Sequence, residues 1–298
     1  MAGQLFKTID DKLRYGKLSP IIYRARMVAH SRHLPALDPA DQWLVDQLIA
    51  TGGTVSSLDE LRLPITDEFR AAVAAVLPEL PTRDAHVPVG DPLVGRDTSL
   101  HCFTMDPPEL AVRFPALVRF GLEERLLDII EAYLGVPVAF TTVHLRKDIG
   151  GGNQVGTRFW HLDTEDVRVI RMMVYLNDVT AADGPFEYIP RPVTDSVPQL
   201  KERAFRSAGD PIFDDEMRRH SSSGMWRPII GPAGTVLLAD NALCYHHGKV
   251  HDGERIVLIY TYTSRRPRYP DLTRNPVFDD VLTARQRACN FIDTTPRG

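Results

Sequence analysis

The sequence has few cysteines and no long apolar run. Its three cysteines, Cys102, Cys244 and Cys289, are scattered and odd in number. This pattern excludes a disulfide framework and a zinc ribbon, and it predicts a reducing, cytoplasmic environment. No run of about 18 apolar residues occurs, and the N-terminus lacks the apolar core of a signal peptide. We therefore expect a soluble cytoplasmic protein without a transmembrane segment.

A surplus of basic charge is also absent. The formal net charge is −4, which argues against a nucleic-acid-binding protein, because such proteins normally carry a basic surplus or stripe. Basic residues gather only in residues 1–33, which contain seven Lys and Arg and two Asp. This segment is typical of a solvated, partly helical lead-in. Peripheral contact with an anionic membrane or partner is the weaker alternative.

The 298 residues fit one domain whose first part, residues 1–136, is mainly helical. Asp38 and Pro39 have the residue types of an N-cap and a first helical position, and Gly52 follows as a stop signal. The apolar residues of this helix predict a buried stripe of Trp43, Leu44, Leu48 and Ile49. A second helix is expected over 66–76, and a third helical stretch over 106–134. The Pro/Gly-rich segment 86–101 matches no regular element.

The pattern changes near Pro137 to short β-branched and aromatic runs separated by turn residues. Such runs predict strands, and their regular spacing predicts an all-β sandwich or barrel, braced by helices, over 137–264. The overall class is β-rich α+β, with the N-terminal helices packed on one sheet. Residues 191–224 form a long polar loop and a candidate lid. Residues 265–298 form a tail with a helix over 277–292. The expected strands cover 138–145, 157–163, 167–176, 186–189, 226–230, 235–239, 243–247 and 255–264.

The stretch from Trp160 to Asp163 contains a histidine and an aspartate two residues apart. On a strand, His161 and Asp163 point to the same side, because side chains alternate. A later histidine, His246 or His247, would complete a set of two imidazoles and one carboxylate. That set leaves one face of an octahedral metal open and suits non-heme Fe(II). Neighbours on a strand face opposite ways, so only one of the two later histidines can join. Alternation alone does not decide which one.

Several motifs in this order resemble the phytanoyl-CoA dioxygenase family of Fe(II)/2-oxoglutarate-dependent oxygenases. They are Trp160-His161-Leu162-Asp163, then Val174-Tyr175-Leu176-Asn177-Asp178-Val179, then Asp183-Gly184-Pro185, and finally a glycine-led apolar strand before His246-His247-Gly248. The resemblance covers about residues 137–264 and implies that this part is a double-stranded β-helix, or jelly-roll. The chain departs from the family at Pro190-Arg191-Pro192, where the family continues with glycine, serine and histidine.

The resemblance implies metal ligation of Fe(II) by His161, Asp163 and His246, since the family has a His-x-Gly motif at the last position. It implies 2-oxoglutarate as cosubstrate and O2 as oxidant, with hydroxylation of a C–H bond and release of succinate and CO2. Arg255 occupies the position of the family's oxoglutarate-binding arginine, and a guanidinium suits a carboxylate. Arg171 is a competing clamp, because an arginine in an apolar strand needs either a protein carboxylate or a ligand. Gln154 is a further candidate contact for the cosubstrate.

Two other functions remain open at this stage. One is another metal-dependent jelly-roll enzyme, such as a cupin-type isomerase or a zinc hydrolase, and the other is a non-catalytic binding module. We expect a small-molecule substrate. The arginines of 191–224 fit an anionic substrate, but they fit a solvated charged loop equally well: Arg203, Arg206, Arg218 and Arg219. The sequence indicates neither the substrate nor the oligomeric state.

Overall fold

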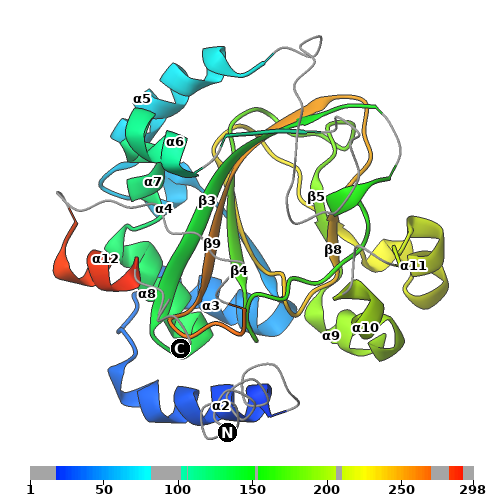
Figure 1. Cartoon of the computed structure of the whole chain (residues 1–298), viewed down its shortest axis with the longest axis horizontal. Coiled ribbons are helices and arrows are strands. Elements are labelled where there is room, and N and C mark those ends of the chain that lie inside the picture. The colour runs from blue at the N-terminus through cyan, green and yellow to red at the C-terminus, as the bar shows by residue number, and fades with distance from the viewer. Residues whose placement is uncertain are drawn as a thin grey trace, which may run out of the picture.

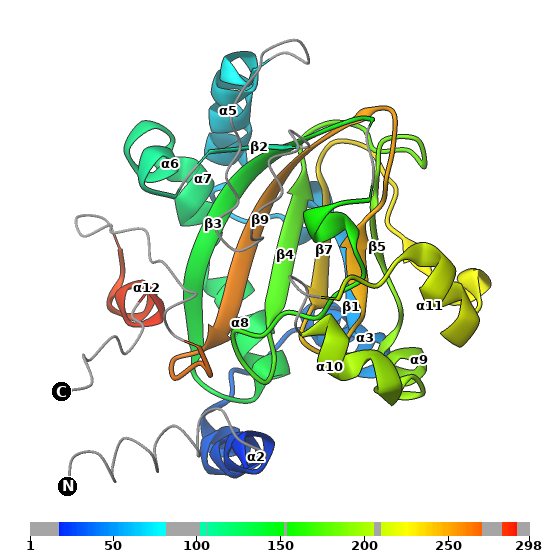
Figure 2. The same cartoon turned by 45° about the vertical axis from the view of Figure 1, so that its right-hand side comes forward.

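Two antiparallel sheets face each other in the centre of the molecule (Figures 1 and 2). The computed structural model describes residues 18–81, 102–105, 107–151, 154–205, 210–269 and 282–290. The larger sheet has the strand order β1-β7-β4-β9-β3-β2, and the smaller sheet has the order β6-β5-β8. The larger sheet contains β1 (Gly53–Ser57), β2 (Cys102–Met105), β3 (Val138–Ile149), β4 (Ile170–Tyr175), β7 (Thr235–Asp240) and β9 (Glu254–Ser264).

The smaller sheet contains β5 (Phe186–Tyr188), β6 (Arg227–Pro228) and β8 (His246–Gly248). A single antiparallel bridge joins His161 to His246 and extends this sheet beyond β8. Two facing antiparallel sheets with this order make a double-stranded β-helix, so the predicted fold class is confirmed.

Alternation along the strands gives the larger sheet two different faces. On β4, Met172 and Val174 pack under the helices, whereas Met173 and Tyr175 pack towards the smaller sheet. The register of β3 shifts between Phe140 and Thr142, so Thr141 is one extra residue. Side chains alternate between the two faces again after such a bulge, but the extra residue changes which positions face inward. The inward-facing positions of β3 after the bulge are Thr142, His144, Arg146 and Asp148.

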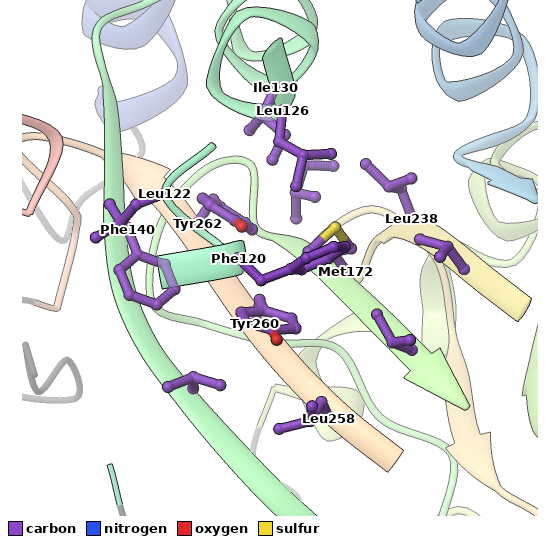
Figure 3. Packing of buried hydrophobic residues seen from close by; sticks show 14 of the residues in the cluster. Phe120, Leu122, Leu126, Ile130, Phe140, Met172, Leu238, Leu258, Tyr260 and Tyr262 are labelled. Atoms are coloured by element: carbon purple, nitrogen blue, oxygen red, sulfur yellow. The ribbon is translucent and has the colours of Figure 1, made fainter. Parts of the chain in front are cut away.

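Helices cover the outer face of the larger sheet. Figure 3 shows Phe120 of this layer beside Met172 and Tyr260 of the strands, with Ile130 above them in the view. Phe120 also lies between Phe69 and Tyr260, with ring centroids 4.3 and 5.9 Å away. The helices of the N-terminal part are α2 (Ser19–His30), α3 (Pro39–Thr51), α4 (Leu58–Leu61), α5 (Thr66–Val76), α6 (Pro107–Arg113), α7 (Pro115–Phe120) and α8 (Glu124–Leu134).

The predicted ends of α3 are confirmed. Asp38 accepts a hydrogen bond from the backbone N–H of Asp41 at 2.8 Å, and Gly52 ends the helix with φ of +81°. The predicted apolar stripe is half wrong. Leu44 and Leu48 are buried, but Trp43 and Ile49 are 53% and 52% exposed. The helix turns its Leu44–Leu48 side inward.

The prediction of a loop over 191–224 is wrong, because this segment contains short helices. They are α9 (Arg191–Asp195), α10 (Lys201–Ala204) and α11 (Asp214–His220). Their apolar side chains form a separate cluster with Trp160, Trp226 and Tyr245, and Figure 1 shows the three helices below and to the right of β8. The side chains of Arg203 and Arg218 pair with carboxylates of the same segment, which are Asp210, Asp214, Asp215 and Glu216. The role of the segment as a lid stays a prediction.

Strands β1 and β2 and the stretch 157–163 also differ from the sequence analysis. Strands β1 and β2 lie in the part expected to be helical, and β1 pairs with β7 along its whole length. The stretch 157–163 is not a regular strand: it begins as a 3-10 turn and pairs only through bridges at Trp160 and His161. Within the expected tail helix over 277–292, the described residues form α12 (Ala284–Cys289), and residues 277–281 and 291–292 lie outside the described residues. Residues 86–101 and 1–17 lie outside the described residues.

Within the described ranges, no helix has the length and apolarity needed to cross a membrane.

Candidate metal centre

Side chains from two separate parts of the chain meet between the two sheets. One ligand atom from each of His161, Asp163 and His246 lies within 4.8 Å of the other two. Asp163 Oδ1 is 4.0 Å from His161 Nε2 and 3.7 Å from His246 Nε2. The bridge between His161 and His246 brings the two imidazoles together, with ring centroids 4.2 Å apart. The structure therefore brings together the three residues proposed as ligands.

Backbone carbonyls fix the orientation of both imidazoles. His161 Nδ1 is 2.8 Å from the carbonyl oxygen of Phe159, and His246 Nδ1 is 3.0 Å from that of Cys244. A carbonyl oxygen only accepts hydrogen bonds, so each Nδ1 carries the proton. Each Nε2 then has a lone pair directed towards the other two residues. This is the orientation that a metal-binding histidine requires.

The charges around the three residues favour metal binding at neutral pH. Burial, together with the neighbouring His161, lowers the pKa of His246 to about 3, so this imidazole is neutral. Burial also lowers the pKa of His161. Burial opposes the ionisation of Asp163, but the Arg171 guanidinium and the two imidazoles outweigh it and hold its pKa well below the ordinary value. Two neutral imidazoles and one carboxylate result.

Arg171 contacts protein carboxylates rather than open space. Its Nε donates to Asp163 Oδ2 at 2.8 Å, and its Nη2 donates to Glu165 Oε1 at 2.5 Å. Its Nη1 donates to Thr261 Oγ1. Of the two alternatives for this arginine, the structure shows pairing with the protein. The contact occupies one oxygen of Asp163 and leaves Oδ1 facing the imidazoles.

His247 faces the opposite way from His246. Its Nε2 lies 3.0 Å from Glu187 Oε2, and its ring stacks on Trp160 with centroids 3.9 Å apart. Its Nδ1 lies 3.0 Å from the carbonyl oxygen of Arg158. His247 is thus held on the outer side of the smaller sheet, under the helical segment 191–224.

Arg255 lies on the inner face of the larger sheet, where β9 pairs with β3. Its Nε and Nη2 donate to Asp148 Oδ2 at 3.0 and 2.6 Å. Its Nη1 is buried and has no hydrogen-bond partner among the described residues. The other oxygen of Asp148 accepts from Arg146 Nε at 2.7 Å, and the charge of Arg158 also acts on this carboxylate. The single carboxylate of Asp148 therefore lies among several guanidinium groups. The patch formed by Asp148, Arg146, Arg158 and Arg255 has an excess of positive charge.

Gln154 is placed away from His161, Asp163 and His246. Its amide nitrogen donates to the carbonyl oxygen of Arg158 and to Asp214 Oδ1, at 2.7 and 3.0 Å. These contacts put it beside His247, on the outer side of the smaller sheet. It is bound to the protein in this structure, and its role as a cosubstrate contact stays a prediction.

The sequence analysis missed three polar residues of this region: Asp148, Glu165 and Asn241. Asp148 and Glu165 are buried partners of the two arginines that it did select. A signal was present, since a buried arginine requires a nearby carboxylate. Asn241 lies in a turn, where asparagine is common for local reasons, so no sequence signal marked it.

The arrangement of the sheets is shared with known structures. The chain is similar to EctD from S. alaskensis, solved with 2-oxoglutarate and 5-hydroxyectoine, at 20% identity and a TM-score of 0.50, covering 78% of this chain and 79% of that one. It is also similar to HygX from Streptomyces hygroscopicus, solved with nickel and 2-oxoglutarate, at 18% identity and a TM-score of 0.49, covering 77% of this chain and 88% of that one.

A third similar structure is SnoN, described as a non-heme alpha ketoglutarate dependent epimerase from nogalamycin biosynthesis. The identity is 14% and the TM-score 0.48, covering 76% of this chain and 84% of that one. No family model and no curated protein matches the sequence. At these identities, the likeness to EctD establishes a shared fold.

Proposed function

We propose that this protein is an Fe(II)- and 2-oxoglutarate-dependent oxygenase of the phytanoyl-CoA dioxygenase type. It oxidises a C–H bond of a small molecule and releases succinate and CO2. The observation that carries the proposal is the meeting of His161, Asp163 and His246 between the two sheets. The fold supports it, because EctD, which shares this fold, was crystallised with 2-oxoglutarate.

The donor set fits a non-heme iron. Two neutral imidazole nitrogens and one carboxylate oxygen occupy one face of an octahedral ion and leave the opposite face open. Bound Fe(II) would supply the activation of O2 and the oxidation of the substrate. Asp163 would hold the metal through Oδ1, while Arg171 fixes the other oxygen of the same carboxylate. The carbonyls of Phe159 and Cys244 keep the imidazole rings aimed at the ion.

The patch around Arg255 fits an anionic cosubstrate. A buried guanidinium nitrogen without a partner is costly, and a carboxylate is the group that satisfies it best. We assign Arg255 to the distal carboxylate of 2-oxoglutarate. Arg146, on the neighbouring strand and the same inward face, adds a second positive charge. This charge favours a small substrate that is itself anionic.

Succinate formation tests the proposal. With Fe(II), 2-oxoglutarate, O2 and a panel of small anionic metabolites, the wild type should release succinate. His161→Ala, Asp163→Ala and His246→Ala should each lose about 100-fold or more, because groups that only orient metal ligands already contribute 10- to 100-fold. His33→Ala is the matched control: this exposed histidine ends the 3-10 turn after α2 and should leave the rate unchanged.

Other results would point to the other functions. Turnover with Zn2+ and without 2-oxoglutarate would support a metal-dependent isomerase or hydrolase. Tight ligand binding that survives a chelator would support a non-catalytic module. Either result, without succinate release, contradicts the oxygenase.

A further inference from the structure

Asn241 lies beside the three proposed ligands, in the turn between β7 and β8. It is 2% exposed, and its backbone is held on both sides. Its N–H donates to the carbonyl oxygen of Val169 at 2.9 Å, and its own carbonyl oxygen accepts from the N–H of Asp163 at 2.9 Å. Asn241 therefore keeps a fixed position relative to Asp163.

The side-chain amide of Asn241 contacts the nitrogen that His246 would offer to a metal. Its Nδ2 is 2.9 Å from His246 Nε2. Because His246 Nδ1 donates to a carbonyl, Nε2 has only a lone pair, and the Asn241 amide nitrogen must be the donor. The amide oxygen is then left buried without a hydrogen-bond partner among the described residues. A buried amide oxygen in this state requires an explanation.

An imidazole nitrogen has one lone pair, so it cannot accept from Asn241 and bind a metal at the same time. Metal binding at Nε2 must break the contact with Asn241. Since the backbone of Asn241 is fixed, the released amide remains next to the metal. Its two N–H groups are then available to an anionic ligand on the open face.

We propose that Asn241 has two linked roles at this site, an inference that rests on the proposed function. In the metal-free protein its amide holds His246 Nε2, and it gives way when the metal binds. In the metal-loaded protein the same amide donates a hydrogen bond to a carboxylate bound at the metal. Asn241 is thus a positioning residue in one state and a contact to the anionic ligand in the other.

The test compares Asn241→Leu, which has a similar volume and no donor, with the wild type. Co2+ serves as a visible stand-in for Fe2+, and its binding is followed by absorbance. The variant should bind Co2+ about 5-fold more tightly, because one competing hydrogen bond is lost. The Co2+-loaded variant should bind 2-oxoglutarate about 5-fold more weakly in calorimetry, because the donor to its carboxylate is lost.

Gln286→Leu is the matched control. Gln286 also has a structural side-chain amide: it donates to the carbonyl oxygen of Leu122 and accepts from the N–H of Thr283. This control should lose stability and keep both affinities. If Asn241→Leu does not fold, Asn241→Ala replaces it with the same expectations.

Unchanged or weaker Co2+ binding in a folded Asn241 variant overturns this inference and leaves the proposed function standing. Unchanged 2-oxoglutarate binding overturns the second role. A wild type that binds no Co2+ overturns both the proposed function and this inference.

Discussion

Arg171 is the residue on which the orientation of Asp163 depends. Its three side-chain nitrogens donate to Asp163, Glu165 and Thr261. The two carboxylates raise the pKa of Arg171 against the effect of burial, so the guanidinium is always charged. Without it, two buried carboxylates would lie close together. Burial and the charge of Asp163 already raise the pKa of Glu165.

We predict that Arg171→Met destabilises the protein by about 3–5 kcal/mol, because it leaves buried carboxylates unpaired. The same change should weaken Co2+ binding, since one Asp163 oxygen is no longer held. Urea unfolding and Co2+ titration measure the two effects.

Arg70→Met is the control for this substitution. Arg70 pairs with Asp59 on the surface, where an ion pair contributes only about 0–1 kcal/mol. Equal losses of stability in the two variants would contradict the role assigned to Arg171.

At the residue scale, the sequence identified the three proposed ligands but not the groups that orient them. His161 and Asp163 were found through their spacing, which was interpreted as alternation along a strand. The stretch 157–163 is not a regular strand, but it still brings both side chains to the site. The choice between His246 and His247 required the register of β8, which depends on contacts far along the chain. Asn241 and Asp148 act only through tertiary neighbours, so no local pattern reveals them.

Among the elements, Asp240 joins α8 to two strands of the larger sheet. Its Oδ2 accepts from Tyr133 on α8 at 2.7 Å, and its Oδ1 accepts from the backbone N–H groups of Ala242 and Val169 at 3.1 and 3.3 Å. Burial raises its pKa to about 6, against the lowering effect of the Tyr133 hydrogen bond. The carboxyl group of Asp240 is therefore protonated in mildly acidic solution.

This pKa predicts a pH-dependent contribution to stability. The folded protein holds this proton more tightly than the unfolded chain, whose aspartates titrate near 3.9. The contribution is full below that pH and is lost as the pH rises through about 6. Asp240→Asn lacks this proton exchange. Its free energy of unfolding relative to the wild type should therefore rise by about 2 kcal/mol between pH 4 and pH 8.

Urea unfolding at several pH values measures this difference. Asp59→Asn, a change at an exposed carboxylate, should show no such trend. A flat difference for Asp240→Asn would mean that folding leaves the pKa of Asp240 unchanged.

The elements with strong local signals were predicted, and those without were not. Helix α3 has an N-cap, a proline and a terminal glycine, and its ends were found. Strand β1 is short and lies among helices, so only its pairing with β7 defines it. The helices of 191–224 have four to seven residues, too few for helical periodicity to appear. Their burial comes from contacts with Trp160 and Tyr245.

The described part of the molecule is arranged in four layers: N-terminal helices, larger sheet, smaller sheet and the helical segment 191–224 (Figure 1). Separate apolar clusters join each layer to the next. The proposed metal centre lies in the middle space, between the sheets. Its shape therefore depends on the layers on both sides.

Phe120 joins the first two layers, so we predict that Phe120→Ala destabilises the protein by about 3–5 kcal/mol. Thermal and urea unfolding measure this loss. Val112→Ala, at a position 83% exposed in the same helical layer, should stay within about 0.5 kcal/mol of the wild type. A loss below about 1 kcal/mol for Phe120→Ala would mean that the helical layer is not needed to hold the sheet.

The adjacent histidines of β8 create a hazard during folding. If this strand paired one residue out of step, His247 would enter the space between the sheets, because a one-residue slip turns every side chain over. A molecule with this misaligned strand would still place an imidazole there, so metal binding would not favour the correct register. The correct register is instead favoured by the contacts of His247 with Glu187 and Trp160 on the outer side of the smaller sheet, which a slip would break.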